Sequence, residues 1–302
     1  YPPMDVEVPA KSTLLGLGYL ASVLRDKGHN AMIIDCSLAN RAFKINHADY
    51  IGISCMFTDC KKSNYNFIKN LKEIYPKIPF IVGGAHASTF PEEMIEFADT
   101  VVVGEGEEVI CDIVENKRKG IIRTNRIKDL DSLPMPAWDL MEEDMREINR
   151  LSAKSPFLMR RPLAHIITSR GCPNNCTFCA VKVAWGRQWI PRSAESVVDE
   201  IEYLYNKGYR EIHFNDDNCS INKERMYAIS NEIISRKLGV KLACPTGIHI
   251  GTLERNLLKI MKRAGFYRLC FGIETGNQEM QKKIKKNIDL DKARQVIKDA
   301  ND

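Results

Sequence analysis

Short apolar runs alternate with amphipathic stretches along the first 117 residues. Strands are predicted where the runs are short and bounded by polar residues, at 31–34, 50–54, 79–82 and 100–103. Helices are predicted where apolar positions recur every three or four residues, at 12–27, 62–75, 91–97 and 105–117. Strands that alternate with helices in this way are typical of a doubly wound, Rossmann-like parallel sheet.

A second alternation begins at Leu163. The predicted strands are 163–168, 211–215, 240–244 and 268–273, and the predicted helices are 194–206, 223–236, 253–263, 278–285 and a last one from Asp291. Four such units do not close a (β/α) barrel, so an α/β fold is expected in which a partial barrel follows the doubly wound sheet. Between them, Pro134 and Pro136 prevent a continuous helix. The expected domains are 1–117, a connector at 118–162, and 163–302.

Both ends of the chain suggest a fragment that is truncated at its C-terminus. Residue 1 is Tyr, Tyr1-Pro2-Pro3 resembles the exit of a strand, and the chain stops at Asp302 within a helical pattern. A first strand is therefore expected upstream of Tyr1.

Loops rich in glycine follow several strands of the first sheet. Residues 54–58, 83–86 and 104–107 lie where strands end, and open α/β sheets bind ligands at the carboxyl ends of their strands. Glycine permits a bulky ligand to approach the backbone closely, but it also permits tight turns. On the residues alone, both interpretations stay open.

Composition and charge narrow the function classes. Hydrophobic residues make up 44% and charged residues 27%, which is typical of a globular protein. The net charge is +5, and basic clusters such as 117–119 and 282–286 lack interleaved aromatic residues, so they are interpreted as solvated surface and no nucleic-acid partner is expected. The longest apolar stretch near the start, 14–24, is shorter than the roughly 20 residues of a membrane span. With no recognisable leader, a cytoplasmic protein without a membrane span is expected.

Three of the ten cysteines are closely spaced. Cys172, Cys176 and Cys179 follow an apolar strand, and soft thiolates are typical ligands of iron–sulfur centres. Three thiolates on a four-iron cluster leave one iron open, and Phe178 could shield the cluster edge. The alternative is a structural zinc site, which normally needs four ligands, and Cys219 or Cys270 would then have to supply the fourth.

This CxxxCxxC motif, with an aromatic residue before its last cysteine, resembles that of the radical S-adenosylmethionine superfamily. The resemblance implies a [4Fe–4S] cluster on Cys172, Cys176 and Cys179 whose open iron chelates S-adenosylmethionine. It also implies reductive cleavage to a 5′-deoxyadenosyl radical, with an electron from a donor such as flavodoxin or ferredoxin. Phe178 would lie beside the bound S-adenosylmethionine.

Two further strand ends resemble the cobalamin-associated branch of that superfamily. Asn215-Asp216-Asp217 replaces the usual Gly-Gly-Glu, and 271–276 reads Phe-Gly-Ile-Glu-Thr-Gly. The resemblance implies that Asp216 and Asp217 lie near the methionyl amino group, and that Glu274 and Thr275 lie near the ribose or the amino group. Alternatively, Glu274 is simply an acidic residue at the end of a strand and Thr275 caps a turn.

The N-terminal half resembles the cobalamin-binding domain of the same branch. Leu15–Ala21, the Gly-Gly-Ala-His loop, Gly104–Glu107 and Leu130–Pro134 occur in the order seen there. The Asp-x-His-x-x-Gly motif that supplies a lower cobalt ligand in methionine-synthase-like domains is missing, which leaves that ligand open. The cobalamin contacts that the resemblance implies are Leu17, Gly18, Ser54, Thr58, Gly83, Gly84, His86, Glu105 and Gly106.

The resemblance implies a cobalamin-dependent methyltransferase that acts on a small molecule. The first alternative is a radical oxidative cyclase of a tetrapyrrole-like or other natural product. A tRNA methylthiotransferase would need three more cluster ligands, and Cys36, Cys55, Cys60 and Cys111 lack their spacing. A non-catalytic corrinoid or iron–sulfur sensor would leave the open three-cysteine site without a purpose. The residues do not identify the substrate.

Overall fold

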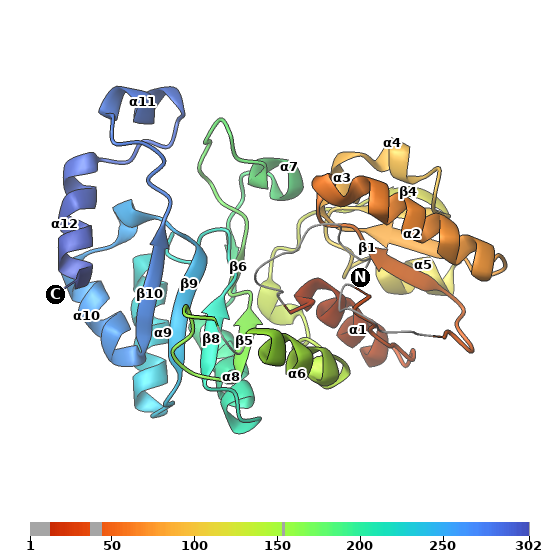
Figure 1. The fold of residues 1–302 in the computed structure, drawn as a ribbon, viewed down its shortest axis with the longest axis horizontal. Coiled ribbons are helices and arrows are strands. Elements are labelled where there is room, and N and C mark those ends of the chain that lie inside the picture. Colours follow the sequence, from red (N-terminus) through yellow and green to blue (C-terminus); the bar gives the residue numbers. More distant parts are fainter. Residues whose placement is uncertain (1–12, 37–43, 153–154, 302) are drawn as a thin grey trace. The chain divides into compact units, whose positions relative to one another are not determined.

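The computed structural model describes residues 13–36, 44–152 and 155–301 (Figure 1). The chain divides into two compact units, one formed by Tyr1–Ile127 with Leu133–Ser152 and the other by Lys128–Ser132 with Ala153–Asp302. The domain bounds 1–117, 118–162 and 163–302 remain a prediction from the sequence.

Four parallel strands form the sheet of the first unit, in the order β1-β2-β3-β4. The strands are β1 (Ile51–Ser54), β2 (Phe80–Gly83), β3 (Thr100–Val103) and β4 (Gly120–Arg123). The helices are α1 (Leu15–Asp26), α2 (Lys61–Ile74), α3 (Ala85–Thr89), α4 (Pro91–Met94) and α5 (Ile110–Glu115). The expected doubly wound parallel sheet is confirmed.

Side chains alternate between two faces of this sheet, and each face has its own core. Phe80 and Val82 of β2 pack with Ile68 of α2, whereas Ile81 between them packs with Ile113 of α5. Successive side chains of a strand point to opposite faces, so a strand covered on both faces needs a continuous apolar run. The sequence Phe80–Val82 supplies that run.

Two expectations for this unit were wrong. The apolar run at 31–34 is not a strand in the structure. Conversely, β4 lies inside the expected connector. As an edge strand, β4 pairs only with β3 and is partly exposed, so its apolar signal is confined to Ile121 and Ile122.

Residues 133–152 of the expected connector also belong to the first unit, whereas 128–132 and 153–162 belong to the second. After the single turn η3 (Trp138–Met141), helix α6 (Glu142–Leu151) buries Met145 and Ile148. The proline segment lies against α1, where the backbone N–H of Ala137 donates to the carbonyl of Gly18 at 3.0 Å. The two prolines exclude a helix only at their own positions. The helix at 142–151 was not predicted, because its sequence pattern is mostly polar.

The second unit contains an open parallel sheet in the order β10-β9-β8-β5. Its strands are β5 (Leu163–Ile166), β8 (Glu211–Phe214), β9 (Lys241–Ile248) and β10 (Phe266–Phe271). Its helices are α7 (Val181–Trp185), α8 (Ala194–Asn206), α9 (Lys223–Ser235), α10 (Arg255–Ala264), α11 (Gln278–Lys283) and α12 (Leu290–Asn301). The sheet is not closed in the described residues, as expected for a partial barrel.

A short antiparallel pair brackets the cysteine motif. Strand β6 (Ser169–Arg170) immediately precedes it, and β7 (Ile190–Pro191) returns after α7. Helix α8 then begins at Ala194, and the hydroxyl of the preceding Ser193 accepts the N–H of Ser196 at 3.1 Å as the predicted N-cap. The pair was not predicted, because two residues per strand carry no periodic signal.

Candidate functional site

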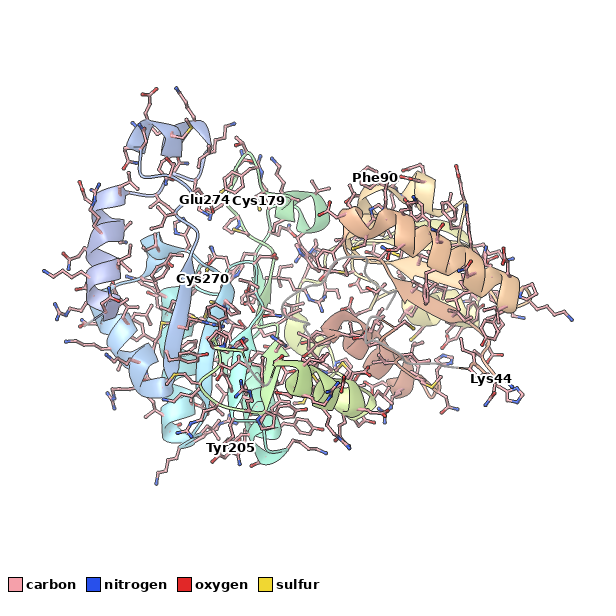
Figure 2. The ribbon with its side chains drawn as sticks, viewed as in Figure 1. Lys44, Phe90, Cys179, Tyr205, Cys270 and Glu274 are labelled. Atoms are coloured by element: carbon pink, nitrogen blue, oxygen red, sulfur yellow. The ribbon has the colours of Figure 1, made fainter. Side chains whose placement is uncertain are left out.

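A cavity of about 370 Å³ lies at the carboxyl ends of the second unit's strands. Figure 2 shows two of its lining residues, Cys179 and Glu274, on neighbouring segments at one end of that unit. Residues of the cysteine loop line it together with residues that follow β8 and β10 and with the end of β9. The cysteine loop contributes Cys172, Asn174, Cys176, Phe178 and Cys179, and the strand ends contribute Asn215, Asp216, Asp217, Asn218, Thr246, Gly247, His249, Gly272, Glu274 and Lys286.

The cysteine loop has little regular structure of its own. Gly171 turns the chain into it with a φ of 87°, which favours glycine. Within the loop, the N–H of Cys179 donates to the carbonyl of Cys176 at 3.3 Å, and the N–H of Thr177 donates to the carbonyl of Ile284 at 3.0 Å. Contacts from other segments therefore determine where the thiols lie.

The three thiols share one wall of the cavity. Cys176 is buried, whereas Cys172 and Cys179 are partly exposed. Burial raises the pKa of the Cys176 thiol, and the positive charge of Lys286 opposes that rise. A positive charge beside the Cys176 thiol favours its anionic, ligating form.

The donor set fits a polynuclear cluster. Among the described residues, no three His, Cys, Asp or Glu side chains gather closely enough around one point to hold a single metal ion. A zinc ion needs such convergence, whereas each ligand of a cubane cluster reaches a different iron. Three thiols along one wall of a cavity suit the second arrangement.

Lys286 lines the cavity, and the sequence interpretation did not single it out as a site residue. Its ammonium lies 3.0 Å from the Glu274 carboxylate and 5.8 Å from the centre of the Phe178 ring. Its side chain is only 17% exposed, so assigning the basic run 282–286 to solvated surface was wrong at this position. From the sequence alone, a shielded lysine within a run of lysines cannot be distinguished from its exposed neighbours.

Glu274 adopts an unusual backbone conformation. Its φ of 68° lies in the left-handed region, which non-glycine residues rarely occupy. Gly272 leaves room for its ion pair, because an added Cβ would lie 2.7 Å from the Glu274 carboxylate and 2.9 Å from the Lys286 ammonium. Backbone strain of this kind is concentrated at ligand sites.

The other residues expected near S-adenosylmethionine differ in position. Phe178 is 56% exposed at the cavity wall. Asp216 and Asp217 line the cavity, but their carboxylates bind the segment that precedes Cys172. Thr275 does not line the cavity. Its hydroxyl accepts the N–H of Asn277 at 3.2 Å, which agrees with the alternative of a turn cap.

His86 of the first unit is fully engaged by protein partners. Its side chain is buried, with Nδ1 3.2 Å from the Thr58 hydroxyl and Nε2 3.0 Å from the Tyr65 hydroxyl. Burial lowers its pKa, which favours a neutral ring. Both ring nitrogens of His86 are thus hydrogen-bonded within the protein, and neither is available to bind cobalt in this arrangement. The location of His86 beside a corrin ring remains a prediction.

Several other expected cobalamin contacts also have structural partners. The buried Glu105 carboxylate accepts bonds from Arg126 and from the N–H of Ile127, both at 2.8 Å. An added Cβ at Gly18 would lie 2.8 Å from the terminal methyl of Met141, and one at Gly106 would lie 3.1 Å from Leu20. Leu17 is partly buried in α1. The roles expected for these residues stay predictions.

The two glycines at the carboxyl end of β2, where Gly83 is the last residue of the strand and Gly84 follows it, differ. Gly84 has a φ of 101°, and an added Cβ would lie 2.6 Å from the carbonyl oxygen of Cys55, so the turn itself requires glycine. Gly83, by contrast, has room for a Cβ. Met56 after β1 and Phe90 after α3 are exposed apolar side chains of this unit.

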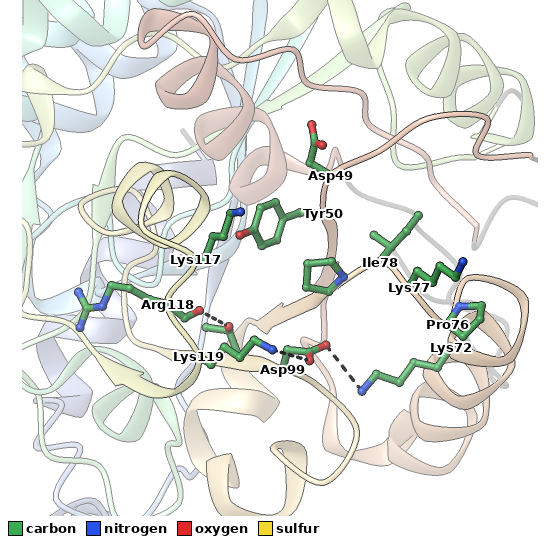
Figure 3. Close-up of a pocket in the computed structure, with 12 residues that line it drawn as sticks. Asp49, Tyr50, Lys72, Pro76, Lys77, Ile78, Asp99, Lys117, Arg118 and Lys119 are labelled. Atoms are coloured by element: carbon green, nitrogen blue, oxygen red, sulfur yellow. Dashed lines mark hydrogen bonds and ion pairs between the residues drawn. The ribbon is translucent and has the colours of Figure 1, made fainter.

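A second cavity, of about 650 Å³, lies at the opposite, amino-terminal edge of this sheet (Figure 3). Lys72 and Lys119 share the Asp99 carboxylate there, at 3.8 and 3.9 Å. None of the residues expected at a ligand site lines it. We therefore take the cysteine-lined cavity as the candidate site.

Two family models match the chain in succession. The B12 binding domain matches residues 4–114, and the Radical SAM superfamily matches residues 166–302. In the described part of the chain, no helix is long and apolar enough to cross a membrane.

Curated relatives cover most of the chain. An uncharacterized methyltransferase from Pyrococcus horikoshii is 29% identical over 95% of this chain and 66% of its own length. Cytidylyl-2-hydroxyethylphosphonate methyltransferase from Streptomyces wedmorensis is 26% identical over 97% and 67%. The anaerobic magnesium-protoporphyrin IX monomethyl ester cyclase of Rubrivivax gelatinosus is 25% identical over 93% and 55%.

Two solved structures share the fold. The cobalamin-dependent S-adenosylmethionine radical enzyme OxsB superposes with a TM-score of 0.75 at 19% identity, over 97% of this chain and 45% of that one. The radical S-adenosylmethionine methyltransferase TsrM from Kitasatospora setae, with cobalamin and a [4Fe–4S] cluster bound, gives 0.72 at 18%, over 96% and 64%. The chain thus spans between 45% and 67% of the length of these five proteins. It carries a B12 binding domain, matched at residues 4–114, followed by a radical SAM domain, matched at residues 166–302.

Proposed function

We propose that the protein is a cobalamin-dependent radical S-adenosylmethionine methyltransferase whose [4Fe–4S] cluster is held by Cys172, Cys176 and Cys179. The observation that carries the proposal is the shared cavity, which brings the three thiols together with the ends of β8, β9 and β10. When bound, the cluster supplies the electron that cleaves S-adenosylmethionine to methionine and a 5′-deoxyadenosyl radical. Flavodoxin or ferredoxin is the proposed source of that electron.

The cavity offers both charges that the methionyl group needs. The amino and carboxylate groups of methionine form a zwitterion at neutral pH, and the Glu274–Lys286 pair presents one carboxylate and one ammonium side by side. Phe178 adds an apolar wall beside them. We propose that these three side chains orient S-adenosylmethionine against the cysteine loop.

We propose that cobalamin binds at the carboxyl edge of the first unit's sheet. The match to the B12 binding domain and the exposed Met56 and Phe90 support this site. Open α/β sheets bind ligands at this edge. Gly83, the last residue of β2, has room for a Cβ, so its backbone remains open to close approach.

We favour methyl transfer to a small molecule over oxidative cyclisation because the methyltransferases match over slightly more of the chain. The two methyltransferases match over 95% and 97% of it, against 93% for the cyclase. The cyclase is the second candidate. The products separate them, because methyl transfer releases S-adenosylhomocysteine in addition to 5′-deoxyadenosine.

The test is anaerobic reconstitution with iron, sulfide and hydroxocobalamin, followed by desalting and an ultraviolet–visible spectrum. We expect a broad cluster shoulder together with retained corrin bands. Replacing Cys172, Cys176 and Cys179 together by Ser should remove the shoulder, whereas Cys270→Ser, at an exposed cysteine outside the cavity, should retain it. A zinc-loaded protein without the shoulder would overturn the proposal, and a shoulder without corrin bands would overturn its cobalamin half.

A further inference from the structure

The loop after β8 reaches back to the chain immediately before Cys172. Asp216 is almost completely buried and accepts three hydrogen bonds: from the N–H of Thr168 at 2.7 Å, from the Thr168 hydroxyl at 2.6 Å and from the Ser169 hydroxyl at 2.5 Å. Asp217 accepts the N–H of Gly171 at 3.0 Å. Two adjacent carboxylates thus bind the segment 168–171, which ends next to Cys172.

Thr168 has every polar group occupied. Besides its two bonds to Asp216, its carbonyl accepts an Nη2–H of Arg225 at 2.6 Å and the N–H of Arg192 at 3.0 Å. Burial raises the pKa of Asp216, and the three hydrogen bonds and the charge of Arg225 oppose that rise. A buried carboxylate is stable only with such partners, so its geometry is tightly restricted.

The loop itself is held by β9. The Thr246 hydroxyl donates to the carbonyl of Asp216 at 3.1 Å. A Cβ added to Gly247 would lie 2.6 Å from the carbonyl oxygen of Asp217, so the two backbones pack without space for a side chain. Contacts therefore run without interruption from β9, through 216–217, to the segment before Cys172.

Asn218, the next residue, reaches the first cysteine directly. Its side-chain Nδ2 lies 3.9 Å from Sγ of Cys172, within hydrogen-bond reach of a sulfur atom. The indole N–H of Trp189 holds its carbonyl at 3.0 Å. Hydrogen bonds to sulfur ligands stabilise the more negative, reduced state of an iron–sulfur cluster and raise its reduction potential.

We infer that Asp216, Asp217 and Asn218 form one positioning element for Cys172, in which the carboxylates fix the segment before it and the Asn218 amide donates to its sulfur. This inference rests on the proposed cluster and assigns to the two aspartates a role other than contact with the methionyl amino group. The contact to sulfur sets the cluster's potential, whereas the contacts to 168–171 set how firmly the cluster is held.

The carboxylate half is tested by anaerobic iron release from the reconstituted protein to a ferrous chelator. Asp217→Ala removes the acceptor of the Gly171 N–H, and we expect release to become roughly two- to tenfold faster, the value of one hydrogen bond. Asp217→Asn keeps an acceptor oxygen and should restore the original rate. Asp199→Asn removes an exposed carboxylate on α8 and should have no effect. Unchanged release from Asp217→Ala would overturn this half.

The amide half is tested by the midpoint potential, from an anaerobic redox titration monitored by electron paramagnetic resonance. Asn218→Leu keeps the size of the side chain without its donor, and we expect the potential to become more negative, with Asp199→Asn unchanged. An unchanged potential in Asn218→Leu would contradict the inference. If the unsubstituted protein assembles no cluster, the proposed function fails first, and that result precedes any comparison of variants.

Discussion

The ammonium of Lys286 lies 3.0 Å from the carboxylate of Glu274, inside the cavity that the three cysteines line. The Lys286 side chain is 17% exposed and that of Glu274 is 39% exposed, so solvent screens the pair less than one in which both partners are fully exposed. It therefore provides a charged site of both signs next to the thiols.

Replacing Lys286 by Met should weaken the binding of S-adenosylmethionine about tenfold, because the loss of one charge-assisted hydrogen bond costs at least about 1.4 kcal/mol. Lys286→Arg keeps the charge and should recover most of the affinity. Lys283→Met, at an exposed lysine of the same basic run, is the control. Equilibrium binding to the reconstituted protein measures the effect, and equal affinities for Lys286→Met and Lys283→Met would refute the role of Lys286.

Replacing Gly272 by Ala should weaken the same binding without a change at either charged residue. The added Cβ would lie 2.7 Å from the Glu274 carboxylate and 2.9 Å from the Lys286 ammonium, so the ion pair must move. Gly239→Ala meets only the Tyr205 hydroxyl, at an ordinary 3.7 Å, and should be neutral. If Gly272→Ala binds S-adenosylmethionine as tightly as Gly239→Ala, the position of the ion pair has no bearing on the ligand.

Substitutions at Gly84 and Gly83 should distinguish a glycine that the turn requires from a glycine that lets a ligand approach the backbone. Gly84→Ala combines a φ of 101° with a contact of 2.6 Å to the Cys55 carbonyl oxygen, and we expect a loss of about 2 kcal/mol or more in the free energy of unfolding. Gly83→Ala should leave that free energy unchanged within about 1 kcal/mol and reduce cobalamin retention. Denaturant titration and corrin absorbance after desalting measure the two effects. Full retention by Gly83→Ala would argue against close approach of a ligand there.

Glu211 is the centre of a buried polar network below the candidate site. Its carboxylate binds His213 at 2.7 Å and the Tyr267 hydroxyl at 2.5 Å, and it accepts the N–H groups of Met159 and Arg160. Although burial opposes ionisation, these hydrogen bonds lower its pKa. Glu211→Gln should therefore reduce the free energy of unfolding by about 3 kcal/mol.

Denaturant titration at neutral pH measures the change at Glu211. Glu279→Gln removes a carboxylate that is 76% exposed in its ion pair with Lys283, and should stay within about 0.5 kcal/mol. A Glu211→Gln variant as stable as this control would show that the network contributes little to folding.

His165 should make stability depend on pH. It is buried beside His213, and burial lowers its pKa to about 3, against about 6.5 in the unfolded chain. Between these values the unfolded chain binds a proton that the folded protein does not, so stability falls as the pH falls through 6.5. From pH 7.5 to 5.5 the loss is about 1.4 kcal/mol for this group.

Denaturant titration at the two pH values tests this. His165→Phe should reduce the loss between them by about that amount, whatever its own stability at pH 7.5. His86 and His249, whose pKa values burial also lowers, contribute with the same sign and remain in the variant. An equal loss in the variant and the unsubstituted protein would exclude a buried, neutral His165.

Most strands and long helices were predictable because their signals are local. The strand at Thr100–Val103 and the helix at Ala194–Asn206 have the predicted bounds, since each carries its apolar period and its turn residues within a few positions. The spurious strand at 31–34 and the missed β4 show the limit of this approach. Whether a short apolar run becomes a strand depends on a hydrogen-bonding partner that the run does not encode.

The sequence by itself determined the chemistry of the site, because the spacing of Cys172, Cys176 and Cys179 and the position of Phe178 are properties of one short segment. Only the tertiary structure decided what surrounds that segment. Asp216 meets Thr168 across 48 positions of the chain, and Lys286 meets Glu274 only because 272–286 folds over the cavity. Such contacts depend on the order of the parallel strands and on how their ends are packed, and no local pattern in the sequence records them.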